Sequence, residues 1–408
     1  MARITEILRK SKGSSGEEEK PSVAVQQVPF RKQTASSPRK EENLKMSEIL
    51  SVDELLKDSE DKGVSTLISK DELRRKSSGM LDEKSDSKSE DGDWIYGDVD
   101  KIYEDAKKQV GLAMDHGKSG QTFSVDEVAE CTARMVQSLM AGDRLYLKAV
   151  YTRHSSTDLI SHSLNVAIFA LKVGMGLSYS ENQLIRLGTV ALLHDIGMAK
   201  LDAGIINKED VLTKEEYEEM KRHPEYSYEM LTRLGRQYEW IATVVRQEHE
   251  RINGKGYPRG LSGQDLHEYA QIIGLVDFYE ALTHTRPQRR RFLPYDAIKI
   301  IVEQEKGVFA QKLIKTLLRK ISVFPLEGFV KLNTNEIGKV VETSEERPLR
   351  PTVEILYQAE GQKLKVPRTI SLKDNPLIYI TSSVYEEDIL GEKNGWNLHA
   401  TAKHHRNP

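Results

Sequence analysis

The sequence predicts a mainly α-helical protein, in which a helical bundle is preceded by a disordered arm and followed by a small C-terminal β-rich subdomain. Three observations support this. Apolar residues recur at three-and-four spacing from about residue 124 to 318. Later they gather in short β-branched or aromatic runs, whereas Ser, Lys, Glu and Asp dominate the first 92 residues. The expected parts are a disordered arm with short helical motifs at 1–92, an N-terminal helical segment at 93–157, the main helical domain at 158–320, the β subdomain at 321–385 and a flexible tail at 386–408.

The N-terminal arm carries too little apolar surface to offset the entropy lost on ordering, which is why we expect it to be disordered. Two short apolar islands interrupt it, at residues 4–8 and 46–56. Each can be a transient helix in a linker, or a segment that folds onto a protein partner. The sequence leaves both readings open, and order is expected from about Trp94.

The helical part opens with a recognisable start signal. Ser124-Val-Asp-Glu127 is a capping-box pattern and predicts a helix that runs to Gly142. Apolar periodicity predicts further helices over residues 164–173, 182–193, 214–234, 241–248 and 270–283.

The C-terminal part has the pattern of a small antiparallel sheet or barrel. Strands are expected over residues 329–332, 338–341, 352–357 and 377–380. These runs contain no cluster of metal-binding side chains, so packing against the bundle or binding a partner is their expected role. The tail histidines at 399, 404 and 405 are interpreted as solvated side chains rather than a metal site.

Composition argues against several classes of protein. The net charge of −3 gives no general basic field for nucleic acid. No apolar run approaches the roughly 18 residues that span a bilayer, and the N-terminus lacks a signal-peptide core. Cys131 is the only cysteine, which fits a reducing compartment. We therefore expect a cytoplasmic protein that binds neither nucleic acid nor membrane; a homodimer is left open.

The most informative pattern is a set of nitrogen and oxygen donors spread over the helical domain. His194 and Asp195 end an apolar run, and Asp158 and His162 are four residues apart, so that they share a helix face. Such a set without thiolates suits an Fe, Mn or Zn pair better than a structural zinc site. A carboxylate such as Asp195 could bridge two cations about 3.5–4 Å apart, and a hydroxide between them could attack phosphorus in line. The eight candidate metal ligands are Asp158, His162, His194, Asp195, His223, Glu248, His249 and Asp277.

Each of these residues also has a plain structural interpretation, as a hydrogen-bonded core histidine or a paired helix carboxylate. Their joint occurrence favours a metal-dependent phosphohydrolase, with Asp195 and His194 as its catalytic pair.

Five segments together resemble the HD-GYP family, the HD-superfamily phosphodiesterases that degrade the bacterial second messenger cyclic di-GMP. They are His-Ser-Leu-Asn-Val at 162–166, Leu-His-Asp-Ile-Gly at 193–197, Lys-Arg-His-Pro at 221–224, the Asn-Gly-Lys-Gly-Tyr-Pro region at 249–261, and the Asp and Arg-Pro segment at 277–289. The resemblance implies an HD-type bundle, a signal-transduction hydrolase, and two or three divalent ions, Fe or Mn, on the candidate ligands. Asp158 matches a third-metal carboxylate found in some members.

The resemblance also implies a substrate site. Arg286 and Arg289 fit a clamp on the substrate phosphates, because a guanidinium pairs bidentately with phosphate oxygens. Tyr257, in a glycine-rich turn, could stack on or hydrogen-bond the substrate. The alternatives are a solvated cationic face for the arginines and a purely structural turn for the tyrosine.

Two positions depart from the family pattern. Met198 stands where members carry a lysine that contacts the scissile phosphate, and the nearest amine is Lys200. Glu248 replaces a histidine; it remains an oxygen ligand, but its charge lowers the Lewis acidity of the metals. Two functions follow: hydrolysis of cyclic di-GMP through a metal-bridged hydroxide, or a catalytically impaired module that senses cyclic di-GMP or metal and relays it to protein partners. A third, an HD hydrolase of another phosphoester, is disfavoured by the Gly-Tyr-Pro segment.

Overall fold

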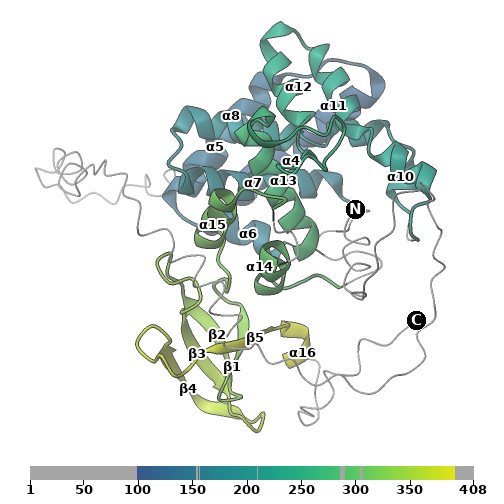
Figure 1. Cartoon of the computed structure of the whole chain (residues 1–408). Helices are drawn as coiled ribbons and strands as arrows, with labels where there is room; N and C mark the ends of the chain where they lie inside the picture. The colour runs from purple at the N-terminus through teal and green to yellow at the C-terminus, as the bar shows by residue number, and fades with distance from the viewer. Residues whose placement is uncertain are drawn as a thin grey trace, which may run out of the picture.

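The computed structural model describes residues 99–390, apart from 153, 154, 156, 209, 285–289 and 304–306. The predicted arm at 1–92 and the histidines of the tail lie outside the described residues, as do Arg286 and Arg289. Within the described part, helices form one bundle and a five-stranded sheet lies beside it (Figure 1). The prediction of a mainly α-helical fold with a small C-terminal β-rich part is confirmed.

The bundle begins with three helices, α4 (Val99–Ser119), α5 (Val125–Ala141) and α6 (Arg144–Tyr151). The predicted start of α5 is confirmed, because the Ser124 hydroxyl accepts a hydrogen bond from the Glu127 amide at 3.2 Å. Gly142 ends the helix, as the sequence indicated.

The centre of the bundle is α7 (Leu159–Gly176), which packs on α8 (Glu181–Leu193) and α13 (Glu268–Thr283). Gly174 and Gly188 bring α7 and α8 close together, because a Cβ atom at Gly174 would lie 2.8 Å from a Leu184 methyl group. Two candidate ligands lie on these packed helices, His162 on α7 and Asp277 on α13.

Helix α7 corrects one expectation. It is long and apolar enough to be a candidate membrane span, although no apolar run of that length was expected. Seventy-two per cent of its residues are buried inside the protein, which is typical of a core helix.

The helix expected over residues 214–234 is in fact two, α10 (Lys214–Met220) and α11 (His223–Thr232). Pro224 explains the break, since proline lacks an N–H and favours the first turn of a helix. The break places His223 at the start of α11. Short elements complete this region: η2 (Ile196–Lys200), α9 (Ala203–Ile206), η3 (Arg236–Tyr238), α12 (Glu239–Val245) and η4 (Gly263–Asp265).

Two further helices, α14 (Pro294–Glu303) and α15 (Gln311–Lys320), lie between the bundle core and the sheet (Figure 1). The sheet is antiparallel with strand order β4-β3-β2-β1-β5. Its strands are β1 (Phe329–Leu332), β2 (Ile337–Glu342), β3 (Thr352–Tyr357), β4 (Lys363–Ser371) and β5 (Ile380–Val384).

The sequence located β1, β2 and β3 but missed β4 and placed β5 too early. Strand β4 is an exposed edge strand with Pro367 inside it, so it lacks the alternating apolar pattern of a half-buried strand. A last helix, α16 (Glu386–Leu390), begins where the flexible tail was expected.

Candidate metal centre

The site forms where α8 ends. His194 is the C-cap residue that follows that helix, and Asp195 is the N-cap residue of the tight turn η2. The turn packs against α11 with no room for a side chain at Gly197, whose Cβ atom would lie 2.1 Å from the His223 carbonyl oxygen. The Ser227 hydroxyl fixes the contact by accepting from the Gly197 amide at 2.8 Å and donating to the His194 carbonyl at 3.1 Å. His194, Asp195 and His223 are therefore held by backbone packing.

The described residues contain two groups of side chains whose ligand atoms lie within 4.8 Å of one another. Asp195 belongs to both groups, so its carboxylate lies between them. One group consists of His162, His194 and Asp195, and the other of Asp195, His223, Glu248 and His249.

The first group extends to α13. Nε2 of His162 is 3.6 Å from Asp195 Oδ2 and 3.1 Å from Asp277 Oδ1. Nε2 of His194 also lies 3.6 Å from Asp195 Oδ2. Two imidazoles from α7 and α8 thus face the same carboxylate oxygen.

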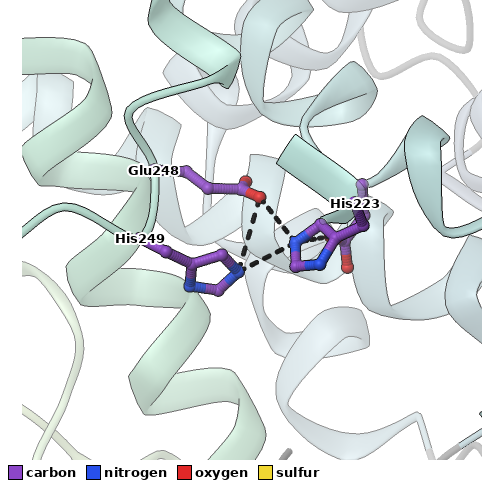
Figure 2. A group of neighbouring side chains, drawn as sticks. His223, Glu248 and His249 are labelled. Atoms are coloured by element: carbon purple, nitrogen blue, oxygen red, sulfur yellow. Dashed lines mark hydrogen bonds and ion pairs between the residues drawn. The ribbon is translucent and has the colours of Figure 1, made fainter. Parts of the chain in front are cut away.

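The second group is the tighter one (Figure 2). Oε1 of Glu248 lies 3.0 Å from His223 Nε2 and 3.5 Å from His249 Nε2. The two imidazole Nε2 atoms are 3.0 Å apart, and Asp195 Oδ1 is 3.3 Å from His223 Nε2. The three labelled side chains of Figure 2 therefore turn their donor atoms toward one point.

Hydrogen bonds on the far side of the rings set which nitrogen faces the centre. Nδ1 of His194 donates to the Ala191 carbonyl at 2.8 Å, and Nδ1 of His223 donates to the Met220 carbonyl at 2.7 Å. With the proton on Nδ1, each Nε2 carries a lone pair directed into the site. This is the arrangement that proteins use to orient metal-binding histidines.

Two buried polar atoms in the site indicate what kind of ligand it could bind. His194 Nε2 and Glu248 Oε2 have no hydrogen-bond partner among the described residues, although both side chains are only 1% exposed. Leaving such atoms unsatisfied is costly, so native proteins rarely do so. Imidazoles and carboxylates that direct their donor atoms toward one point fit divalent cations, and the donor set accordingly fits the metals expected from the sequence.

The electrostatics of the site agree with a cationic occupant. Burial raises the pKa of Glu248 well above its usual range, and attraction to His194 does not offset the desolvation of its carboxylate. Burial and the neighbouring His223 together hold the pKa of His249 well below its usual range. At Asp277 burial would raise the pKa, but the hydrogen bond from His162 and the attraction to the nearby histidines together outweigh it, so the pKa is lowered.

The glycine-rich loop after His249 is clamped by Glu250, a buried carboxylate. Its two oxygens accept from the backbone amides of Arg259 at 2.6 Å and Leu261 at 2.9 Å. Gly256 is required by this packing, since a Cβ atom there would lie 2.3 Å from Glu250 Cα. The Tyr257 ring stacks on the His249 ring, and the two ring centres are 4.7 Å apart. Tyr257, a predicted substrate contact, therefore lies against a ligand of the second group.

The turn η2 contains Met198, which stands at the position of the family's lysine, and Lys200, the nearest amine. Met198 is 4% exposed and packs with Leu201 and Met220 in a small apolar cluster. The Lys200 amine lies 3.3 Å from Glu229 and over the Tyr226 ring, so η2 does not direct it to the metal groups. The predicted substrate contact of Lys200 gains no support from these contacts.

Asp158 has a structural contact at the start of α7. Its side chain caps α7 by accepting from the Ser161 amide at 3.0 Å. It belongs to neither of the metal groups found among the described residues. A role in binding a third metal stays a prediction.

Sequence reasoning gave no role to Glu280, which lies one turn after Asp277 on α13. This carboxylate is 1% exposed and accepts a hydrogen bond from His162 Nδ1 at 2.6 Å. Burial would lower the pKa of His162, but Glu280 and Asp277 outweigh it and raise that pKa well above its usual range. A second carboxylate three residues after a candidate ligand, in an otherwise apolar helix, was the signal available in the sequence.

Replacing Glu280 by Gln should therefore weaken metal binding about 10- to 100-fold, because the amide can still accept from His162 but no longer carries the charge that makes the imidazole a stronger ligand. Titration calorimetry with Mn²⁺ measures this. Glu268→Gln, on the same helix but paired with Tyr179 and Lys312, is the matched control. Equal Mn²⁺ affinities in the two variants would contradict the assigned role.

Comparison with known proteins defines the class. Residues 146–312 match the model of the HD domain, and residues 329–392 match a KOW domain associated with HD domains. The part of the bundle that contains the His-Asp pair therefore matches the HD domain, a domain class that binds divalent metal ions, and the sheet with α16 matches the associated KOW domain.

The chain is similar to bacterial phosphodiesterases of cyclic dinucleotides. It is 26% identical over 272 residues to cyclic di-GMP phosphodiesterase PA4108 of Pseudomonas aeruginosa, covering 67% of this chain and 63% of that protein. It is 28% identical to cyclic di-GMP phosphodiesterase PdeB of Borreliella burgdorferi, covering 49% of this chain and 52% of that protein. A 3'3'-cGAMP-specific phosphodiesterase 3 of Vibrio cholerae is 30% identical, covering 40% of this chain and 36% of that protein. The chain thus spans less than two thirds of these relatives.

Proposed function

We propose that the protein is a metal-dependent phosphodiesterase that hydrolyses cyclic di-GMP. The observation that carries this proposal is the convergence of six nitrogen and oxygen ligands into two groups that share Asp195. The names of the relatives supply the substrate class, a cyclic dinucleotide.

Each side chain would have a distinct role. His162 and His194 would hold one ion, and His223, Glu248 and His249 would hold the other, with Asp195 available to both groups; Asp277 would support the first group through its contact with His162. Divalent ions at these positions would supply Lewis acidity to the phosphodiester and to the attacking water. Fe or Mn is favoured over Zn because the six ligands are imidazoles and carboxylates, without a thiolate. Tyr257 lies at the edge of the second group, where a base or ribose could contact it.

Substrate phosphates need a cationic counterpart, and we assign this role to Arg286 and Arg289 on the connection between α13 and α14. The support is chemical: a guanidinium binds phosphate oxygens bidentately, and the connection starts one turn after Glu280 on the helix that carries Asp277. In a bacterium such an enzyme would act in cytoplasmic signalling, where it would end a cyclic di-GMP signal.

The test is a hydrolysis assay on protein loaded anaerobically with Fe²⁺ or Mn²⁺, with metal content measured on the same sample. Linear or mononucleotide products from cyclic di-GMP are expected. A full complement of metal without turnover of cyclic di-GMP would exclude the proposal, and 3'3'-cGAMP serves as the competing substrate.

Met198 favours one alternative, a module that binds cyclic di-GMP or metal without hydrolysing it and reports this to a protein partner. A thioether carries neither charge nor a hydrogen-bond donor for a phosphate. If this alternative holds, Met198→Lys should hydrolyse cyclic di-GMP where the natural protein does not, at some cost in stability because the residue packs on Leu201 and Met220.

The matched control for this comparison is Met198→Leu, which keeps the apolar packing. Turnover by the natural protein at a rate equal to that of Met198→Lys would remove the alternative and leave the phosphodiesterase.

A further inference from the structure

A row of buried polar side chains leads from the first group to α4. Oε2 of Glu280 lies 2.6 Å from His162 Nδ1, and Oε1 of the same carboxylate lies 3.1 Å from His284 Nδ1. The other ring nitrogen of His284, Nε2, lies 3.3 Å from the Asn165 amide nitrogen, and the oxygen of that amide accepts from the Tyr103 hydroxyl at 3.1 Å. The four residues behind His162 are between 0% and 7% exposed, so their polar atoms depend on protein partners.

The hydrogen bonds of this row have one consistent direction. Because the Asn165 amide oxygen accepts from Tyr103, its amide nitrogen faces His284 and donates to Nε2. An imidazole that accepts at Nε2 carries its proton on Nδ1. Nδ1 of His284 is 3.1 Å from both the carboxylate oxygen and the carbonyl oxygen of Glu280. Asn165 therefore selects the tautomer with which His284 holds Glu280.

We propose that His284 and Asn165 are positioning residues for the first group, and that they set its affinity for a divalent ion without changing that of the second group. Glu280 connects them to the group, because its other oxygen accepts from the His162 ring. Such outer partners fix the orientation of a metal-binding imidazole and make it a stronger ligand. The inference rests on metal binding, which is part of the proposed function, and does not depend on the substrate.

The second group is held by other contacts. Nδ1 of His223 donates to the Met220 carbonyl, and the His249 ring stacks on Tyr257. A change at His284 should therefore weaken one ion and spare the other, which a general loss of stability would not do.

The size of the effect follows from the ligands that remain. His194 keeps its own hydrogen bond to the Ala191 carbonyl, so the first group should be weakened and not lost. We expect roughly a tenfold loss of Mn²⁺ affinity for His284→Leu, and roughly three- to tenfold for Asn165→Leu, which acts one step further from the ligand.

The experiment titrates Mn²⁺ into the metal-free full chain by calorimetry. His284→Leu removes the donor to Glu280, whereas His284→Asn keeps one, because the amide nitrogen of Asn can occupy the place of Nδ1. Asn165→Leu removes the contact with Nε2. The matched control is His267→Leu at the other end of α13, where His267 caps the helix by accepting from the Tyr269 amide.

Both Leu variants of the row should bind one Mn²⁺ ion more weakly and the other as the natural protein does. His284→Asn should recover most of the lost affinity, and His267→Leu should bind both ions normally. The inference is refuted by unchanged affinities, by equal weakening of both ions, or by a His284→Asn protein as weak as His284→Leu.

The tautomer can be tested without any substitution. In metal-free protein labelled with ¹⁵N-histidine, NMR should show His284 with its proton on Nδ1, and a proton on Nε2 would refute the direction of the row. A protein that binds two Mn²⁺ ions but does not hydrolyse cyclic di-GMP would overturn the proposed function alone. A protein that binds no Mn²⁺ would overturn both.

Discussion

Replacing Asp195 by Asn should abolish hydrolysis, with a loss on the order of 10³-fold or more, because the one side chain common to both ligand groups would lose its charge. The amide is nearly the same size, so the packing around η2 should survive. However, one of the two carboxylate oxygens would become an amide nitrogen that repels a cation. We expect the metal content of purified protein to fall below that of any variant in which a ligand of one group alone is changed.

Elemental analysis and initial rates with cyclic di-GMP measure the two effects on the same sample. Asp265→Asn, at an exposed position in η4, is the matched control and should retain full metal and activity. An Asp195→Asn protein that kept its metal and lost less than tenfold in rate would show that Asp195 does not join the two groups.

The second large effect is expected at Gly197, where substitution by Ala should destabilise the fold by about 3 kcal/mol. The added carbon would lie 2.1 Å from the His223 carbonyl oxygen and 2.5 Å from the Ser227 amide nitrogen. Both are backbone atoms, so neither can rotate away as a flexible side chain would. The turn η2 and α11 would have to separate, and His194 and His223 would move apart with them.

Chemical denaturation gives the change in free energy of unfolding, and Mn²⁺ titration shows whether the ligands still converge. Gly142→Ala is the control, because no heavy atom lies within 4 Å of the Cβ atom that it would add. Similar stabilities of the two variants would mean that the turn tolerates a side chain and that its close approach to α11 does not position the ligands.

The sequence predicted the long helices because some, such as α5, have one buried face and a clear period, while α7 and α13 are long apolar runs that are buried on most sides. The predicted bounds of helices and strands were wrong where a local feature interrupts the apolar periodicity. Pro224 divides one expected helix in two, and β4 is an edge strand whose exposed residues show no alternation. Such features depend on what lies beside a segment, which a linear pattern does not record.

The candidate ligands could be located because each lies at a helix end or on a buried helix face. The sequence could not show which of the carboxylates Asp158 and Glu280 lies beside a metal ligand and which caps a helix. Both are carboxylates at helical spacing from a ligand, but Asp158 caps α7 while Glu280 is buried behind His162. The sequence also could not show that Lys200 contacts Glu229, since this contact depends on the conformation of the turn η2.

The ligands of the two groups come from α7, the end of α8, the start of α11 and the turn after α12, so bound ions would fasten together segments that are far apart in the chain. Anything that binds only the native state shifts the folding equilibrium toward it in proportion to the logarithm of its free concentration. The protein would then be more easily unfolded and degraded in a cell starved of the metal. Its abundance, and not its turnover alone, would follow the metal supply.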